Sequence, residues 1–376
     1  MPKPKEILCF SNLPWAERTT RRQMIMSRMR DVKVVWLDPP GGRSGIRGKR
    51  PAPFKPYPHV TVYSSNGFLS PGSSFFRADP IRGQRGYLAY VRDILKREEL
   101  SAPLLWLYSP VYAPLITGIY HEGLVYDCAD LPDRLPWKKS VSIEKQAISL
   151  CRRADVVFAA RRDLYRKLAG INPKTYLLPN GIDYRPKKDS GDPRTGSYPR
   201  PIVGFAGDVS EAVDLDLIEE IGRSIDGTLV LATTGEMRDK LSREDFIRIT
   251  SGENVVPFIT DSQPVLLDAV SDFDVCIAPY LEKAEESDLR SRVFFAYLAS
   301  GKPIVSTRHS ALIESFPDCV YTAGDNAEFL GLLKKAAAGD DPARRERQRV
   351  FADGCRWEAR ISEIRRLLAR EGYLLD

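Results

Sequence analysis

The sequence predicts an α/β protein made of two doubly wound domains, each with a largely parallel sheet. Short apolar runs alternate with helical windows along nearly all of the 376 residues. Most of the runs are continuously apolar, which is typical of parallel strands covered on both faces. A segment rich in Pro, Gly and charge, residues 179–201, interrupts the series, which then begins again. We therefore expect one open sheet on each side of this segment.

The first half alternates six strand-like runs with five helical windows. The runs lie at 6–12, 32–38, 103–109, 124–130, 155–160 and 174–180. The windows lie at 20–30, 85–99, 110–120, 140–152 and 162–169. Strands that alternate with helices along the chain form parallel βαβ units. This half predicts an N-terminal Rossmann-like domain over residues 1–185.

The second half repeats the architecture without a sequence repeat. Its strand-like runs lie at 202–208, 227–235, 254–259, 274–280, 303–307 and 319–324. Its helical windows lie at 214–224, 236–248, 261–271, 289–300, 309–316 and 325–337. A charged stretch and a helix at about 356–371 follow. We expect a second Rossmann-like domain over residues 186–355 and a C-terminal helical segment over 356–376.

Composition excludes several classes of protein. Aromatic content of 10% and hydrophobic content of 43% argue against disorder. The six cysteines are scattered without a CxxC pair, which suits buried thiols in a reducing compartment. Three distant histidines make no metal cluster, so no metal is expected. No GxGxxG motif opens either sheet, which disfavours a dinucleotide-dependent dehydrogenase.

The N-terminus is basic and carries no expected signal peptide. The short basic tail leads directly into an apolar strand, and no stretch reaches the ~18 apolar residues that span a bilayer. We expect a cytoplasmic protein, with a peripheral place on the inner face of the plasma membrane as an option.

Charge is concentrated near the N-terminus. Residues 1–50 contain twelve Lys and Arg against four Asp and Glu. This is either a solvated surface or a patch for anionic lipid headgroups or a phosphate-bearing acceptor. Nucleic acid is not an expected partner, because no nucleic-acid module is visible.

Two Gly-bearing strand ends in the second half are candidate phosphate sites. One run ends in Gly207-Asp208 and another in Thr234-Gly235, each just before a helix. Glycine permits close backbone approach, and a helix start offers free N–H groups to an anion. The alternative interpretation of each glycine is that it serves only to make a tight turn, without binding a phosphate.

The predicted helix at 289–300 begins with unusual charges. Ser287 and Asp288 are good capping residues for its N–H groups. Arg290 and Arg292 follow in the first turn, where the helix dipole disfavours cations. A diphosphate at this end would explain both arginines, since guanidinium groups bind phosphate oxygens in pairs. A surface helix with ordinary charges is the alternative.

In the first half, Asp127 and Asp130 lie at the carboxyl end of a predicted strand. Acids in this position can bind sugar hydroxyls or take part in proton transfer. Asp130 could equally cap the next helix.

Several stretches, taken in order, resemble bacterial glycosyltransferases of the GT-B fold. The resemblance is to the broad retaining family 4 group, and within it to the polysaccharide and teichuronic-acid branch. It rests on FSNLPWAERTTRRQ (10–23), VVWLDPP (34–40), LVYDCADLPDRL (124–135), CRRADVVFAARRDLYRKL (151–168), YLLPNGID (176–183), FDVCIAPY (273–280), AYLASGKPIVST (296–307) and RWEARISEIRRLL (356–368).

The resemblance implies two facing domains, with the C-terminal helix crossing back to pack on the first. It implies hexosyl transfer, with retention, from a nucleotide-sugar to a lipid-linked or glycan acceptor, releasing a nucleoside diphosphate. No metal or other cofactor is implied. Asp127 and Asp130 are the expected catalytic acids. The implied acceptor-binding residues are Trp15, Arg21, Arg22 and Gln23. The implied donor-binding residues are Gly207, Asp208, Thr234, Gly235, Phe258, Ser287, Asp288, Arg290 and Arg292.

One position departs from the family pattern. The family has two acids eight positions apart in the donor helix, and the second usually holds the ribose hydroxyls. Here the first is Asp288, but the second position is Ala296. This departure favours an alternative, a catalytically degenerate partner or scaffold protein. A GT-B nucleotide-sugar epimerase is a further alternative.

Overall fold

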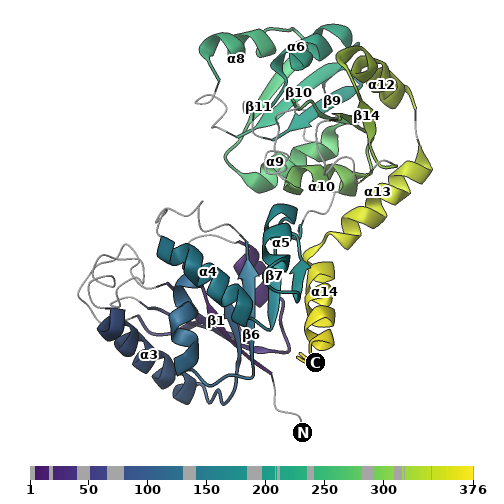
Figure 1. The fold of residues 1–376 in the computed structure, drawn as a ribbon. Helices are drawn as coiled ribbons and strands as arrows, with labels where there is room; N and C mark the ends of the chain where they lie inside the picture. The colour runs from purple at the N-terminus through teal and green to yellow at the C-terminus, as the bar shows by residue number, and fades with distance from the viewer. Residues whose placement is uncertain are drawn as a thin grey trace. The chain divides into compact units, whose positions relative to one another are not determined.

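A computed structural model describes most of the chain, in two compact units. The described residues are 5–16, 20–39, 51–65, 80–129, 141–183, 197–207, 209, 212–234, 241–281, 291–308, 316, 318–339 and 341–375. Unit 1 comprises Met1–Gly181 with Trp357–Asp376, and unit 2 comprises Ile182–Arg356 (Figure 1). The expected boundaries at 185 and 355 lie within a few residues of these.

Unit 1 contains an eight-stranded sheet in the order β3-β4-β2-β1-β5-β6-β7-β8. All neighbouring strands run parallel except β3 and β4. The strands are β1 (Glu6–Phe10), β2 (Lys33–Leu37), β3 (Phe54–Tyr57), β4 (Val60–Tyr63), β5 (Leu104–Leu107), β6 (Gly123–Cys128), β7 (Val156–Ala159) and β8 (Thr175–Leu177).

Helices cover both faces of this sheet, because successive strand residues point to opposite sides. Leu8 and Phe10 of β1 join an apolar cluster with η1 and three helices. Ile7 and Cys9 join a second cluster, with α1 and α14. The first set comprises α3 (Pro80–Arg97), the 3₁₀ helix η1 (Pro110–Gly118), α4 (Val141–Arg153) and α5 (Arg162–Ala169), and the second comprises α1 (Arg21–Met26) and α14 (Trp357–Arg370).

The C-terminal helix α14 belongs to unit 1, although it follows the whole of unit 2 in the chain (Figure 1). Trp357, Ile364 and Leu368 of α14 are almost fully buried in the apolar cluster that also holds α1. Beyond its end, Glu371 accepts a hydrogen bond from Tyr176 of β8 at 2.5 Å. These contacts bury one face of α14 against the sheet.

Unit 2 contains a six-stranded, wholly parallel sheet in the order β11-β10-β9-β12-β13-β14. The strands are β9 (Ile202–Ala206), β10 (Thr228–Thr233), β11 (Val255–Ile259), β12 (Val275–Ala278), β13 (Ile304–Thr307) and β14 (Tyr321–Ala323). The described helices are α6 (Leu215–Ser224), α8 (Arg243–Thr250), α9 (Gln263–Ala269), η3 (Val270–Asp272), α10 (Ser291–Ser300), α12 (Asn326–Ala338) and α13 (Pro342–Gly354). The predicted α/β fold class is confirmed in both units.

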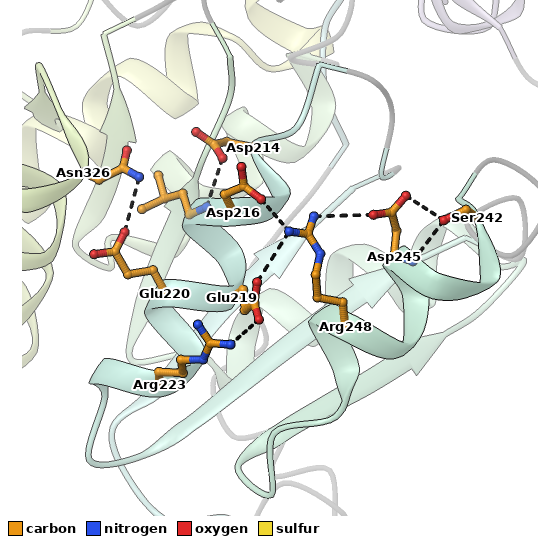
Figure 2. Close-up of polar contacts among 10 residues, drawn as sticks. Asp214, Asp216, Glu219, Glu220, Arg223, Ser242, Asp245, Arg248 and Asn326 are labelled. Atoms are coloured by element: carbon orange, nitrogen blue, oxygen red, sulfur yellow. Dashed lines mark hydrogen bonds and ion pairs between the residues drawn. The ribbon is translucent and has the colours of Figure 1, made fainter.

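A charged network joins α6 to α8 on the surface of unit 2 (Figure 2). Arg248 of α8 lies 2.5 Å from Asp216 and 3.5 Å from Glu219, both on α6. The same guanidinium lies 3.4 Å from Asp245, one turn back on its own helix. Because these groups are partly exposed, the network aligns two neighbouring helices rather than supplying much stability.

Four elements differ from the sequence prediction. Strands β3 and β4 were not predicted, because Pro56 and its neighbouring prolines read as loop; a proline is accommodated on the edge strand β3. The window at 110–120 is a 3₁₀ helix with Pro114 inside it. The charged stretch before α14 is helix α13, which Asp341 caps and Pro342 begins. Its only buried side chains, Gln348 and Ala352, give too weak an apolar pattern for prediction.

Candidate functional site

The first candidate site lies at the carboxyl ends of β1, β5 and β6 in unit 1. Strand β1 has β2 on one side and β5 on the other, so the sheet reverses its winding direction here. Open parallel sheets bind ligands at the carboxyl edge of such a switch point. Three predicted residues meet at this edge: Arg21, Arg22 and Asp127.

Arg21 and Asp127 form a buried ion pair. Arg21 Nε lies 2.9 Å from Asp127 Oδ1, and the side chains are 3% and 0% exposed. Arg21 Nη1 also donates to the backbone carbonyl of Leu178 at 2.8 Å and to Asn180 Oδ1 at 3.3 Å. One guanidinium therefore connects the start of α1 to the end of β6 and to the segment after β8.

Burial dominates the electrostatics of Asp127. Loss of solvent raises the pKa of this carboxyl above its ordinary value, while Arg21 and then Arg22 oppose the shift. The indole N–H of Trp106 also favours the charged form, although its Nε1 lies outside hydrogen-bond geometry with any described acceptor. The pair therefore holds a carboxyl that is easier to protonate than an exposed one.

Arg22 has a different environment from its neighbour. The Arg22 guanidinium carbon lies 5.4 Å from the ring centroid of Tyr108, which follows β5. Arg22 is 7% exposed, and its Nε has no hydrogen-bond partner among the residues that the structure describes. Its positive charge lies near an aromatic face and acts on Asp127, where it favours the charged form of the carboxyl.

Trp15 and Gln23 position the start of α1. The Trp15 backbone N–H donates to Asp38 Oδ1 at 2.8 Å, and its ring meets that of Trp36 edge-on at 4.9 Å. Gln23 forms a capping box with Thr20 and donates to the Trp15 carbonyl at 3.2 Å. Gln23 is 4% exposed, so its side chain is already occupied within the chain.

Two of the twelve basic residues counted in positions 1–50, Arg21 and Arg22, do not lie on the surface. They are buried, at 4% and 7% exposure, so neither contributes to a solvated face or to a surface patch. The physical reason is the packing of α1 on the sheet, which brings Arg21 against Asp127 and Arg22 against the Tyr108 ring. Arg28 also turns inward in part, to the carbonyl of Met24. The other expected catalytic acid, Asp130, lies outside the described residues.

The second candidate site lies at the carboxyl edge of the unit 2 sheet. Gly207 follows β9 with a φ of +142°, and its N–H donates to the Ala232 carbonyl of β10 at 3.0 Å. A Cβ on Gly207 would meet nothing closer than 3.6 Å. Glycine is therefore required here by its positive φ, and not by a lack of space for a side chain. Strand β9 is the switch strand of this sheet, between β10 and β12.

Tyr297 of α10 occupies the point where β9 and β12 separate. Strand pairing between them is confined to Val203 with Val275 and Gly204 with Cys276. Beyond it, the Tyr297 hydroxyl accepts a hydrogen bond from the Ala206 N–H at 2.6 Å and lies 3.3 Å from the Ile277 carbonyl. This buried hydroxyl replaces ladder bonds and keeps the two strand ends apart, as a crevice at the switch point requires.

Other predicted donor residues are only partly placed. Thr234 follows β10 directly, and Phe258 lies in the edge strand β11, half-buried against the core. Arg292 is the second residue of α10, but its side chain lies outside the description. The remaining predicted residues also lie outside the described part of the chain: Asp208, Gly235, Ser287, Asp288 and Arg290.

Ala296 lies in the interior of α10 and is fully buried in the core of unit 2. The position at which the resembled family has a glutamate is therefore occupied in this chain by a residue of the apolar core. α10 ends at Ser300, and Gly301, with a φ of +69°, turns the chain toward β13.

Sequence reasoning missed Tyr108 and Tyr297. Tyr108 had a usable signal, because it lies near the end of the predicted strand at 103–109. Tyr297 had none, because it lies in the middle of the predicted helix at 289–300. Tyrosine in an apolar run reads as core, however, and only the fold shows that its hydroxyl lies at a strand edge.

Neither a metal cluster nor a membrane span is found among the described residues. No group of three or more His, Cys, Asp or Glu side chains there could hold a metal ion. No helix in the same part of the chain is long and apolar enough to cross a membrane. All six cysteines are free and buried.

Comparison with known proteins relates this architecture to sugar transferases. No family model matches the chain. Among curated proteins, "Putative teichuronic acid biosynthesis glycosyltransferase TuaH" of Bacillus subtilis is 21% identical over 291 residues, covering 69% of this chain and 70% of that protein.

Solved structures match nearly the whole chain. A UDP-forming α,α-trehalose-phosphate synthase from Burkholderia vietnamiensis matches with a TM-score of 0.63 at 13% identity, over 98% of this chain and 99% of the other. HepE from Anabaena, in complex with UDP and glucose, matches with a TM-score of 0.61 at 14% identity, over 97% and 100%. The chain therefore has the GT-B fold, as the sequence predicted.

Proposed function

We propose that this protein is a glycosyltransferase that moves a sugar from a nucleotide-sugar donor to a lipid-linked or polysaccharide acceptor, in the biosynthesis of a cell-surface glycan. The observation that carries the proposal is the match of nearly the entire chain to a structure that holds UDP and glucose. The similarity to a teichuronic acid glycosyltransferase supports the acceptor class.

Unit 2 is the proposed donor-binding part. Gly207 and Thr234 follow adjacent strands, so their backbones lie at one edge of the sheet. Backbone N–H groups at such an edge suit the diphosphate of a nucleotide-sugar. Arg290 or Arg292 would neutralise the leaving diphosphate, and Phe258 would contact the base.

Unit 1 is the proposed acceptor-binding part, with Asp127 at its centre. Arg21 holds one carboxylate oxygen of Asp127, and the other oxygen, Oδ2, has no described partner. Oδ2 is the atom that would accept a hydrogen bond from a sugar hydroxyl. Transfer is proposed to proceed with retention and without a metal, because fixed positive charge and backbone dipoles can stabilise the departing diphosphate.

A panel of nucleotide-sugars, with and without a glycan acceptor, tests the proposal. We expect nucleoside diphosphate release that rises when an acceptor is added and that persists in EDTA. Retention is read from the anomeric configuration of the product by NMR. Absence of binding and turnover for every donor would sink the transferase proposal.

A catalytically inactive partner protein is the second candidate, and Ala296 is the observation that favours it. Because Ala296 is fully buried, this position offers no carboxylate to a ribose. The Ala296 backbone alone cannot replace a bidentate contact to two hydroxyls. An active transferase should be stabilised thermally by a nucleoside diphosphate, whereas an inactive partner that has lost the donor site should not.

A lipid-linked acceptor would bring this protein to the cytoplasmic face of a membrane. The excess of Lys and Arg in residues 1–50, without the buried Arg21 and Arg22, supports such an association. Binding to anionic vesicles should weaken as salt is raised. Binding that is absent at low salt would contradict the peripheral membrane location.

A further inference from the structure

The edge strand β3 of unit 1 carries two aromatic side chains that face solvent. Phe54 is 46% exposed and Tyr57 is 44% exposed. A single exposed apolar residue is common on protein surfaces, whereas exposed apolar side chains that lie together mark a binding surface. The arrangement of these two rings therefore decides whether they form such a surface.

A register shift in β3 places both rings on one face of the sheet. Phe54 pairs with Val62 and Tyr57 pairs with Val60, and the register shifts between the two pairs. Residues three apart in a regular strand point to opposite faces, whereas residues directly opposite each other in an antiparallel pair share a face. Val60 and Val62 belong to the apolar cluster that contains α1. Phe54 and Tyr57 therefore both lie on the α1 side of the sheet, because of the shift.

Trp15 connects these rings to the core. Its ring centroid lies 6.2 Å from that of Tyr57, at an interplanar angle of 71°, and 4.9 Å from that of Trp36. Trp36 is fully buried and Trp15 is half-buried. A buried indole thus supports a half-buried one, which meets the exposed phenol. We call Phe54, Tyr57 and Trp15 the aromatic shelf.

The prolines of this segment disfavour a further β-strand as the occupant of the shelf. Pro53, Pro56 and Pro58 flank the two aromatic residues of β3. Proline has no backbone N–H, so this edge cannot offer a full ladder of hydrogen bonds to a partner strand. The fixed φ of each proline also restricts the backbone that carries the rings. An occupant of the shelf therefore contacts the rings rather than the strand edge.

A carboxylate beside Trp15 favours a neutral, hydroxyl-rich occupant over an anionic one. Asp38 is half-buried, and its Oδ1 accepts from the Trp15 backbone N–H at 2.8 Å and from the Trp36 indole N–H at 2.9 Å. Its Oδ2 has no hydrogen-bond partner among the residues that the structure describes. A carboxylate accepts hydrogen bonds from hydroxyls and is repelled by phosphate. Pyranose rings supply both hydroxyls and an apolar C–H face that packs on aromatic side chains.

The shelf adjoins the candidate acceptor site through α1. The Trp15 carbonyl accepts a hydrogen bond from Gln23 at 3.2 Å. Two positions earlier in the same helix, Arg21 pairs with Asp127. The helix has six residues and is therefore about 9 Å long. A glycan of several sugar units is long enough to contact both surfaces.

We propose that the aromatic shelf binds the glycan part of the acceptor, with pyranose rings packed on Tyr57, Phe54 and Trp15. The inference rests on the proposed glycosyltransferase function, and it adds that the acceptor carries several neutral sugar units. Asp38 accepts hydrogen bonds from hydroxyls of these units. The shelf residues hold the chain and take no part in the chemical step.

Calorimetric titration of the full chain with glucose, maltohexaose, cellohexaose and laminarihexaose tests the shelf. At least one hexasaccharide should bind more tightly than glucose, because only a chain covers several rings. Tyr57→Ala should weaken that binding roughly 2- to 10-fold, as loss of one aromatic contact implies. Tyr57→Phe keeps the ring and should bind as the unmodified protein does. Tyr120→Ala is the matched control, since Tyr120 is a tyrosine of the same unit with 81% exposure, and it should leave the affinity unchanged.

A second truncation guards against a local defect in Tyr57→Ala. Phe54→Ala should weaken the same hexasaccharide over the same range. Thermal unfolding of both variants should stay close to that of the unmodified protein, because both side chains are about half exposed. Unchanged hexasaccharide affinity in both variants would overturn the proposal, as would failure of all three hexasaccharides to bind.

Vesicles separate a glycan from a membrane surface as the occupant. Phosphatidylcholine vesicles with and without phosphatidylglycerol are the probes. Vesicle binding that requires Tyr57, with no hexasaccharide binding, would replace the proposal by a membrane contact. Hexasaccharide binding that requires Tyr57, with vesicle binding indifferent to it, supports the shelf.

Donor assays on the same proteins keep this inference distinct from the proposed function. Hexasaccharide binding through Tyr57 in a protein that turns over no nucleotide-sugar would contradict the transferase function and leave the shelf. Donor turnover with a glycan acceptor whose binding does not depend on Tyr57 would contradict the shelf and leave the transferase function.

Discussion

Arg21 and Asp127 lie 106 positions apart in the chain, and their side chains meet at 2.9 Å with almost no exposure to solvent. The pair joins the first helix of unit 1 to the strand that ends at the candidate acceptor site. Its burial makes it a structural constraint and raises the pKa of the Asp127 carboxyl above its ordinary value.

Removal of Arg21 should destabilise the protein strongly. Arg21→Met leaves Asp127 buried without its counter-charge, and breaking a buried pair in this way costs about 3–5 kcal/mol. Equilibrium denaturation measures the change in the free energy of unfolding. Arg97→Met is the matched control, because the Arg97–Asp93 pair is exposed, with side chains 66% and 52% accessible. The control should cost less than about 1 kcal/mol. Equal losses in the two variants would show that the Arg21 pair is not structurally important.

The stability contributed by Asp127 should fall as pH rises. Burial raises the pKa of this carboxyl in the folded state above the unfolded value of about 3.9. A group of this kind contributes stability that is fully present below the unfolded pKa and is lost as pH rises through the folded pKa. Compared with Asp127→Asn, the unmodified protein should therefore lose relative stability between acid and neutral pH. Denaturation of both proteins across that range measures the difference. A relative gain with rising pH would mean that Arg21 outweighs burial.

The hydroxyl of Tyr297 should contribute to the stability of unit 2. Tyr297→Phe leaves the Ala206 N–H without its partner in a fully buried place, at a cost of about 1–3 kcal/mol. Hydrogen exchange at Ala206 should accelerate in the same variant, since β9 and β12 are no longer bridged. Tyr120→Phe is the control, because Tyr120 is 81% exposed. A Tyr297→Phe protein as stable as this control would rule out the bridging role.

Gly207 should not tolerate a side chain. Gly207→Ala forces a φ of +142° on a residue with a Cβ, which costs about 1–3 kcal/mol or displaces the strand end. Nucleotide affinity should fall with stability, because this strand end is the proposed donor edge. Gly86→Ala is the contrasting control: Gly86 lies in α3 with nothing within 4 Å, so alanine should stabilise by about 0.5–1 kcal/mol. Thermal unfolding with and without UDP measures both the stability and the nucleotide affinity of each variant. If Gly207→Ala and Gly86→Ala changed the melting temperature in the same direction, the positive φ of Gly207 would not be what requires glycine there.

The alternation of apolar runs and helical windows was sufficient to predict two parallel sheets and their helices. A strand buried on both faces must be apolar throughout, so its pattern is local and can be read from a few adjacent residues. The same local reasoning failed for β3, where prolines on an edge strand read as loop, and for α13, which buries too little to show a period.

The sequence by itself determined the fold class, the position of most strands along the chain and the stretches that follow them. Only the tertiary structure decided which of those stretches share an edge and what their charges meet. The sequence left Arg21 and Arg22 open between a solvated surface and a binding site. Their burial could not be predicted, because their partners lie about a hundred positions away and a pattern of neighbours cannot reveal them. Burial then changes the chemistry, since removing water raises the cost of every unpaired charge and shifts the pKa of Asp127.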